Sequence, residues 1–231
     1  MKAVILAGGK GTRLKPYTTI LPKPLVPIGD KAILEILIGR LKKFGITDIT
    51  MCVNHLAELI MAYFGDGSKW GVKIEYSFED IPLGTVAPIK LIKNLPEDFF
   101  VMNGDLLTDF DFRKFYDYHL NSKELLTVAT YKRTHKTDFG VIDIDAVKNI
   151  ATGFREKPEQ TLYVSMGVYV FNKNVLDFVP DNKPFGFDDL MVTLLDKKQP
   201  IKVYPYDGYW LDIGRPEDYE KANEDAEKLS L

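Results

Sequence analysis

The stretch Lys2-Ala3-Val4-Ile5-Leu6-Ala7-Gly8-Gly9-Lys10-Gly11-Thr12-Arg13 decides the fold of this chain. Its first six residues are mostly apolar and predict a short buried strand, and the glycines that follow predict a loop. Glycines lack a Cβ atom, so their backbone N–H groups can approach an anion closely and point at it together. Arg13 adds a planar fork for phosphate oxygens, and Lys23, which stands between two prolines, adds a point charge. The stretch therefore predicts a strand that runs into a phosphate-binding loop.

Two well-known glycine motifs do not match this loop. A Walker loop requires a glycine, four residues and then Gly-Lys-Ser or Gly-Lys-Thr, a spacing that the chain does not contain. A dinucleotide-binding loop requires Gly-x-Gly-x-x-Gly, and here Gly9 and Gly11 are followed by Leu14 in place of the third glycine. For the glycines alone, an ordinary strand and turn with surface cations is the structural alternative.

Composition limits the classes of function. The 231 residues suffice for one sizeable domain, and the net charge of −3 provides no general attraction for nucleic acid or an anionic membrane. We therefore expect neither as a partner. The single cysteine, Cys52, excludes an intramolecular disulfide and a multi-cysteine metal site. No apolar run reaches the ~18 residues that span a bilayer, and no signal peptide is visible, so the cytoplasm is the expected compartment.

Strand and helix patterns alternate along the chain, which predicts an α/β fold: a Rossmann-like, mostly parallel mixed sheet with helices on both faces. The expected strands are 2–7, 48–53, 72–77, 98–102, 125–131, 140–144, 147–155, 163–171 and 201–206. The expected helices are 31–44, 56–64, 86–94, 173–179, 187–196 and 216–229, the last with Tyr219, Ala222, Ala226 and Leu229 facing inward. Ligands of such sheets bind outside the carboxyl ends of the strands, so the loops 8–13, 79–85 and 103–105 are expected to share one site.

Two aspartates at predicted strand ends are candidate ligands for Mg²⁺. Asp105 follows the apolar strand and lies beside the phosphate loop, where an ion can bridge a carboxylate to substrate phosphates. Asp212 lies in Gly208-Tyr209-Trp210-Leu211-Asp212-Ile213-Gly214, at another strand end. For Asp105 alone, a turn residue is the alternative.

Other polar residues are given no catalytic role. Asp109 and Asp111 form an Asp-x-Asp pair of the kind that holds metal in many glycosyltransferases, but Asp111 is better interpreted as the cap of the helix that starts at the next residue. The three histidines, His55, His119 and His135, are scattered and lack the spacing of metal ligands. We expect His119 on the surface of a helix.

The string Leu6-Ala7-Gly8-Gly9-Lys10-Gly11-Thr12-Arg13-Leu14, followed by Pro22-Lys23-Pro24-Leu25, resembles the signature of the sugar-1-phosphate nucleotidyltransferases, also called NDP-sugar pyrophosphorylases. Six motifs match in family order, from residue 1 to about residue 218. The nucleotide-binding residues that the resemblance implies are Leu6, Ala7, Gly8, Gly9, Gly11, Thr12, Arg13, Lys23, Glu79, Pro82, Gly84, Thr85, Asn103 and Gly104.

The same resemblance implies the chemistry. Arg13, Lys23 and Asp105 would be catalytic, and Mg²⁺ would be the cofactor, held by Asp105 and Asp212. A sugar-phosphate oxygen would attack the α-phosphorus of a nucleoside triphosphate, and pyrophosphate would leave. The attacking phosphate is already anionic near neutral pH, so catalysis is expected to consist of positioning and charge neutralisation.

A sugar pocket is implied as well. Three stretches resemble its motifs: Phe139-Gly140-Val141, Glu156-Lys157-Pro158 and Met166-Gly167-Val168-Tyr169. The sugar-phosphate-binding residues that follow are Gly140, Glu156, Lys157, Ser165 and Gly167, with Glu156 on sugar hydroxyls and Lys157 on the sugar phosphate. Taken without the resemblance, Glu156 and Lys157 are typical of an exposed charged loop. Ser165 stands where many mannose and heptose enzymes of this family have Asn, which leaves the sugar open.

The loop Glu79-Asp80-Ile81-Pro82-Leu83-Gly84-Thr85 resembles the segment that recognises the base, in a form most like mannose-1-phosphate guanylyltransferases. The following Val86-Ala87 departs from the usual Ala-Gly. GTP with mannose 1-phosphate, or a related sugar phosphate, is therefore the favoured pair. The alternatives are a glucose-1-phosphate uridylyl- or thymidylyltransferase, a nucleotide-sugar glycosyltransferase that uses the Asp-x-Asp pair, and a non-catalytic nucleotide-sugar sensor.

The expected organisation is one nucleotidyltransferase domain over 1–231. Its nucleotide-binding half covers about 1–110 and its sugar-binding half about 111–215, followed by the helix 216–229. No hexapeptide repeat follows residue 215, so the β-helix domain of many relatives is not expected. A homo-oligomer is left open.

Overall fold

A seven-stranded mixed sheet forms the centre of the computed structural model, which describes residues 1–79 and 81–229. The strand order is β12-β8-β11-β6-β1-β4-β5, and all neighbours are parallel except β11, which runs antiparallel to both β6 and β8. The strands are β1 (Lys2–Leu6), β4 (Asp48–Val53), β5 (Lys73–Phe78), β6 (Asp98–Asn103), β8 (Leu126–Lys136), β11 (Glu159–Asn172) and β12 (Lys202–Tyr206). The predicted α/β fold with a mostly parallel sheet is thus confirmed.

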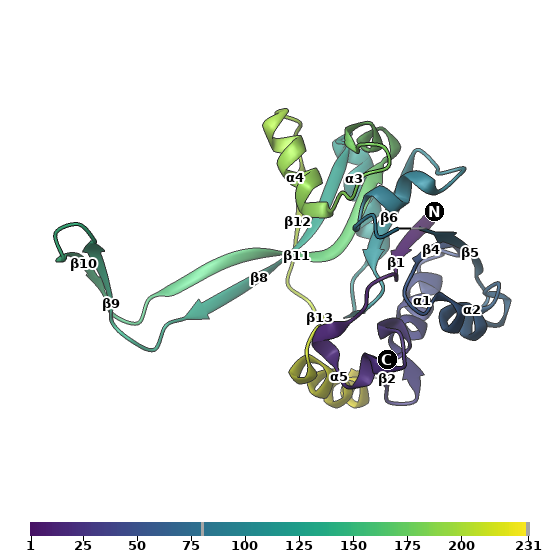
Figure 1. The fold of residues 1–231 in the computed structure, drawn as a ribbon, viewed down its shortest axis with the longest axis horizontal. Helices are drawn as coiled ribbons and strands as arrows, with labels where there is room; N and C mark the ends of the chain where they lie inside the picture. Colours follow the sequence, from purple (N-terminus) through teal and green to yellow (C-terminus); the bar gives the residue numbers. More distant parts are fainter. Residues whose placement is uncertain (80, 230–231) are drawn as a thin grey trace.

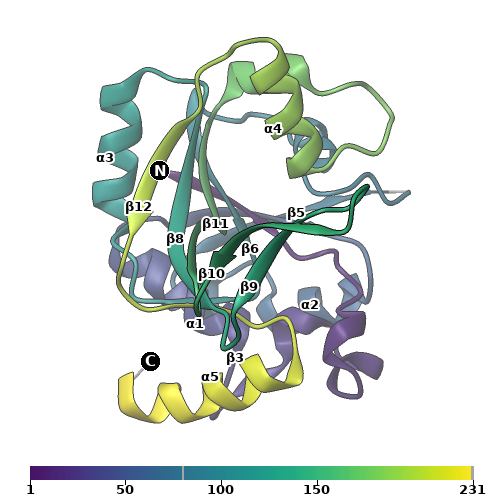
Figure 2. The same ribbon diagram turned by 90° about the vertical axis from the view of Figure 1, so that its left-hand side faces the viewer.

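Helices cover both faces of the sheet (Figures 1 and 2). One core cluster joins the sheet to α1 (Ile33–Lys43), α2 (Ala57–Phe64) and α3 (Phe112–Ser122), and a second joins the other face to α4 (Phe187–Asp196). The central strands are apolar on both faces because both are buried, as is usual for parallel sheets. None of the helices among the described residues is long and apolar enough to cross a membrane.

A third core cluster ties the C-terminal helix α5 (Pro216–Leu229) to α1 and to the small strands β2 (Pro27–Ile28) and β13 (Trp210–Asp212). β2 pairs antiparallel with β3 (Lys31–Ala32). β13 pairs antiparallel with β7 (Leu106–Thr108), directly after β6. Ala222 is buried and Tyr219 and Ala226 pack against this cluster, as predicted. The side chain of Leu229 lies outside the described residues.

Several expected helices are shorter than predicted. Residues 31–32 form a strand, so α1 begins only at Ile33. The expected helices 86–94 and 173–179 are short 3-10 segments, η5 (Ala87–Leu91) and η6 (Lys173–Phe178). Pro88 in the first turn of η5 supplies no N–H donor, and the segment is too brief for α-helical pairing to propagate. The remaining 3-10 turns are η1 (Thr12–Leu14), η2 (Tyr17–Thr19), η3 (Lys23–Leu25) and η4 (Ser68–Trp70).

The most unusual feature is an arm, residues 132–163, that projects from the sheet (Figure 1). β8 and β11 continue beyond the body as a two-stranded antiparallel ribbon, paired from Thr130↔Ser165 to Lys136↔Glu159. The tip is a second antiparallel pair, β9 (Val141–Asp145) and β10 (Ile150–Arg155). No residue of the arm, which the structure describes throughout, is buried.

His119 was predicted to lie on the surface, and that prediction is wrong. It is 2% exposed on the inner face of α3. Its Nδ1 lies 2.7 Å from Thr127 Oγ1 and its Nε2 lies 3.1 Å from Asp98 Oδ1. Two polar partners on β6 and β8 allow the ring to be buried, which the helical pattern of the segment could not indicate.

Candidate functional site

A cleft of about 660 Å³ opens at the carboxyl ends of β1, β4, β5 and β6. All residues predicted to bind the nucleotide line it: Leu6, Ala7, Gly8, Gly9, Gly11, Thr12, Arg13, Lys23, Glu79, Pro82, Gly84, Thr85, Asn103 and Gly104. Asp105 lines it too. The carboxyl ends of neighbouring parallel strands meet at one edge of a sheet, so loops distant in the sequence converge there.

The loop after β1 is held against the segment that carries Lys23. Gly11 has φ +59°, and a Cβ atom there would lie 3.0 Å from Thr18 Cγ2 and 3.2 Å from Lys23 Cβ. The Thr18 hydroxyl donates to Gly11 O at 2.7 Å. Around Gly9, in contrast, no atom lies within 4 Å of where a Cβ would stand, so its backbone faces open space. The loop is therefore anchored on one side and open to a ligand on the other.

Lys23 forms an ion pair with Asp105, whose Oδ2 accepts from the ammonium group. Their side chains are 13% and 17% exposed. The other oxygen, Asp105 Oδ1, is buried and has no hydrogen-bond partner among the described residues. Such an orphaned carboxylate oxygen at the floor of a cleft is one that a cation can satisfy.

Asp212 lies close to this pair because β13 pairs with β7, which places Asp212 opposite Leu106. Burial and the negative charge of Asp105 raise the pKa of Asp212 to about 6, against the opposing effect of Lys23 and Arg13. Arg13 extends to the same place: its Nη2 would lie 3.5 Å from a Cβ atom on Gly214. Two carboxylates and two cations thus lie close together; Arg13, Lys23 and Asp105 line the cleft, whereas Asp212 does not.

This arrangement fits Mg²⁺. The ion is usually held by one or two carboxylates together with substrate phosphates. Asp105 and Asp212 supply two carboxylates, and the unpaired Asp105 Oδ1 offers a free ligand atom. Among the described residues no group of three or more His, Cys, Asp or Glu side chains is suited to hold a metal.

The loop after β5 forms the opposite wall, and Glu79 organises it. Glu79 Oε2 accepts from Leu83 N at 2.7 Å, while Asn54 Nδ2 donates to Glu79 O at 3.2 Å. Gly84 has φ +88°, and a Cβ there would lie 2.9 Å from Phe185 O. The Thr85 hydroxyl accepts from the N–H of the first residue of α4. Asp80, which belongs to the loop predicted to recognise the base, lies outside the described residues.

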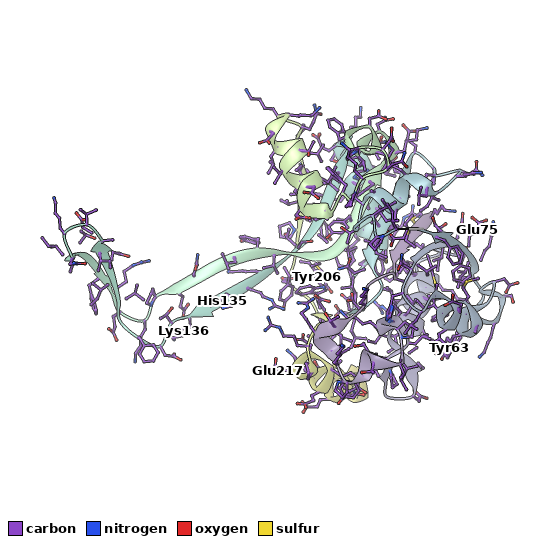
Figure 3. All side chains as sticks on the ribbon, in the orientation of Figure 1. Tyr63, Glu75, His135, Lys136, Tyr206 and Glu217 are labelled. Atoms are coloured by element: carbon purple, nitrogen blue, oxygen red, sulfur yellow. The ribbon has the colours of Figure 1, made fainter. Side chains whose placement is uncertain are left out.

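The predicted sugar-binding residues are divided between two places. Gly167 is next to the cleft: it has φ +70°, and a Cβ there would lie 2.5 Å from Asn103 Nδ2. Ser165 is two residues away, with its Oγ 3.0 Å from Tyr169 Oη. The remaining three residues, Gly140, Glu156 and Lys157, do not line the cleft and belong to the arm. Figure 3 shows the labelled arm residues His135 and Lys136 well outside the body.

The Asp-x-Asp pair is structural. Asp111 Oδ1 accepts from Lys114 N at 3.0 Å and caps α3, which confirms the predicted cap. Asp109 Oδ1 accepts from the Tyr206 hydroxyl and, at 2.8 Å, from Tyr209 N. Neither aspartate lines the cleft.

Six lining residues were not predicted: Lys10, Pro24, Cys52, Asn54, Pro88 and Gly214. Asn54 directly follows the predicted strand 48–53, so the rule that found the other strand-end loops could have found it as well. Burial, with a smaller effect of the Glu79 charge, raises the pKa of the Cys52 thiol to about 12, and this thiol is therefore inert at neutral pH.

A family model described as "Nucleotidyl transferase" matches residues 2–229. The chain belongs to this family. The mannose-1-phosphate guanyltransferase of Debaryomyces hansenii is 35% identical over 227 residues, which cover 95% of this chain and 62% of that protein. The UTP–glucose-1-phosphate uridylyltransferase of Synechocystis sp. is 36% identical over 242 residues, covering 96% and 62%. The chain thus spans about three fifths of the length of these curated relatives.

Solved structures agree with the fold. HddC from Yersinia pseudotuberculosis has a TM-score of 0.75 and 30% sequence identity, with 97% of this chain and 98% of that chain covered. A second structure of HddC, in complex with GMP-PN, has a TM-score of 0.73. Both matches extend over nearly the full length of each chain.

Proposed function

We propose that this chain makes an NDP-sugar and pyrophosphate from a nucleoside triphosphate and a sugar 1-phosphate. The observation that carries the proposal is the cleft in which a glycine loop, Arg13 and the Lys23–Asp105 pair converge, with the carboxylate of Asp212 near Asp105. A phosphate oxygen of the sugar phosphate attacks the α-phosphorus, the bond from that phosphorus to the bridging oxygen of the β-phosphate breaks, and pyrophosphate takes the electron pair. No protein nucleophile is required.

Each cation has a distinct task in this proposal. Arg13 is suited to grip the β- and γ-phosphates, because its planar fork can donate to two oxygens at once. Lys23 emerges beside Gly11 and reaches the end of β6, where its charge offsets that of the reacting phosphate. Asp105 and Asp212 would hold Mg²⁺, which supplies neutralisation of phosphate charge when bound. Lys157 would bring the sugar phosphate to the α-phosphorus.

GTP with mannose 1-phosphate or a related sugar phosphate is the proposed substrate pair. Curated relatives with 33–35% identity, among them those of Debaryomyces hansenii and Candida albicans, are mannose-1-phosphate guanyltransferases. The Glu79 carboxylate has its Oε2 occupied by Leu83 N, which leaves Oε1, near Gly8, for a donor on the base. Guanine offers N1–H and an exocyclic amine, whereas uracil and thymine lack the amine.

Glucose 1-phosphate with UTP or dTTP is the second candidate, favoured by the 36% identity to the Synechocystis uridylyltransferase. A matrix of five nucleoside triphosphates against a panel of sugar 1-phosphates, read out as released pyrophosphate, separates the two. We expect the highest kcat/KM for GTP. A preference of tenfold or more for UTP or dTTP would overturn the guanine assignment, and release of no pyrophosphate from any pair would overturn the reaction itself. The cytoplasm stays the predicted compartment.

A further inference from the structure

The tip of the arm carries apolar side chains in the open. The exposed large hydrophobic residues of the arm are Phe139, Ile142, Ile144, Val147, Ile150, Phe154, Leu162 and Tyr163. Val147 is 92% and Ile144 63% exposed. A two-stranded hairpin without a core beneath it is marginally stable in water, and a contiguous apolar surface marks a contact site. The arm therefore requires something to pack against.

The arm also carries part of the site. Gly140 and Glu156 are neighbours at the base of the tip hairpin, since a Cβ on Gly140 would lie 3.2 Å from Glu156 Oε2. Lys157 follows with φ +42°. These three residues resemble the sugar-binding motifs, and none of them lines the cleft of its own chain. Of the predicted sugar-binding residues, Ser165 and Gly167 lie outside the arm, and Gly167 is beside Asn103, which lines the cleft.

The ribbon that supports the tip is built to hold it away from the body. Seven consecutive residue pairs, from Thr130↔Ser165 to Lys136↔Glu159, form an unbroken antiparallel ladder. Neither 126–136 nor 159–166 contains glycine or proline, and the register shifts only between Ser165 and Tyr169, at the root. At ~3.3 Å per residue, six steps place the end of the ladder roughly 20 Å beyond Thr130. Returning the tip to its own cleft requires breaking this ladder.

We propose that two copies of this chain exchange arms, so that the β9–β10 tip of each packs over the cleft of the other and completes its sugar site with Glu156 and Lys157. The proposal rests on the proposed function, because it assigns these residues to that reaction. The exchange is reciprocal, so it closes as a two-fold dimer and does not propagate into a filament. Exposed apolar side chains adjoin the lining residues of the receiving cleft: Phe78, 52% exposed, precedes Glu79, and Ile81, 55% exposed, precedes Pro82.

The first test is the mass in solution, which does not depend on activity. Light scattering coupled to size exclusion should give twice the 26.3 kDa of one chain. Ile144→Asp, at the tip, should convert the dimer to monomers. Leu195→Asp on α4, with 60% exposure against 63% for Ile144, is the matched control and should leave the dimer intact. A monomeric wild type, or a dimer unaffected by Ile144→Asp, would overturn the exchange.

The second test asks whether the arm acts in the partner's site. Lys23→Ala removes the cation that the cleft contributes to the site, and Lys157→Ala removes the cation that the arm contributes. Each variant alone should lose activity. After refolding together at equal amounts, arm exchange predicts about a quarter of wild-type activity, because about half of the dimers are mixed and each has one complete site. An arm that serves its own chain predicts none. Absence of complementation in a dimer, or full activity of Lys157→Ala alone, would overturn the proposal.

The two proposals fail in different ways. If the wild type releases no pyrophosphate but Ile144→Asp dissociates a dimer, the reaction is wrong and the exchanged arm stands as an interface. If the wild type is active as a monomer, the reaction stands and the exchange is wrong. The Leu195→Asp control separates a specific effect at the tip from a general effect of an added surface charge.

Discussion

Replacing Lys23 by alanine is the sharpest test of the site, because one ammonium group serves two purposes. It pairs with Asp105 Oδ2, and its charge lowers the pKa of Asp212. The other oxygen of Asp105 already lacks a partner among the described residues. Lys23→Ala therefore leaves a carboxylate that is 17% exposed with neither oxygen compensated, and it removes the charge that would face the reacting phosphates.

The two losses have different magnitudes. An oriented charge at a transition state is commonly worth ~3–4 kcal/mol, so kcat should fall by about two to three orders of magnitude. An uncompensated buried polar group costs about 1–3 kcal/mol of unfolding free energy, and the opening of the cleft to solvent favours the lower end. In a chain of this length about 1 kcal/mol corresponds to roughly 2–4 °C, so Tm should fall by a few degrees while the fold is retained.

The assay combines pyrophosphate release with thermal unfolding, and a double variant provides the control. Lys23→Ala with Asp105→Asn removes the uncompensated charge, so its Tm should recover towards the wild type although its activity stays low. A folded Lys23→Ala protein with more than half of wild-type turnover would remove Lys23 from the mechanism. A double variant no more stable than Lys23→Ala would refute the account of the ion pair.

Three further outcomes are expected. EDTA should abolish activity and Mg²⁺ should restore it. Asp105→Asn and Asp212→Asn should each cause a severe loss of activity, and the double variant should be little worse than the worse single variant, because both aspartates act on one ion. Additive losses in kinetic assays would contradict this. Asp109→Asn should retain most activity but lower Tm by weakening the bonds from Tyr206 and Tyr209, and loss of activity at unchanged Tm would favour the glycosyltransferase alternative. Burial raises the pKa of the Cys52 thiol from 9.0 to about 12, so between these two pH values the thiol loses its proton in the unfolded state but keeps it in the folded state. The stability advantage of the wild type over Cys52→Ala should therefore be intact below pH 9 and decline between pH 9 and pH 12. Chemical denaturation of both proteins across this range measures it, and a constant difference would contradict the expectation.

The sequence predicted which loops lie together at the cleft, while the binding of a nucleotide there stays a prediction. Each predicted loop follows an apolar strand, and strand, glycine loop and cap are local patterns of a few residues. Once the sheet is parallel, its geometry brings the strand ends together, so the loops 8–13, 79–85 and 103–105 could be assigned to one cleft. Asp111 was predicted as a cap for the same reason, because the bond to Lys114 N spans three residues. The division into a nucleotide-binding and a sugar-binding half stays a prediction.

Only the tertiary structure decided the partners of side chains that are far apart in the sequence. Lys23 and Asp105 are separated by 82 positions. His119 on α3 is buried because Asp98 on β6 and Thr127 on β8 give its ring polar partners. The arm shows the same limit most clearly. Its residues read locally as strands and charged loops, and nothing local indicates that β8 and β11 pair so far beyond the body. Strand register and direction are set by long-range pairing and packing, whereas hydrophobic period and turn residues report only on their immediate neighbours.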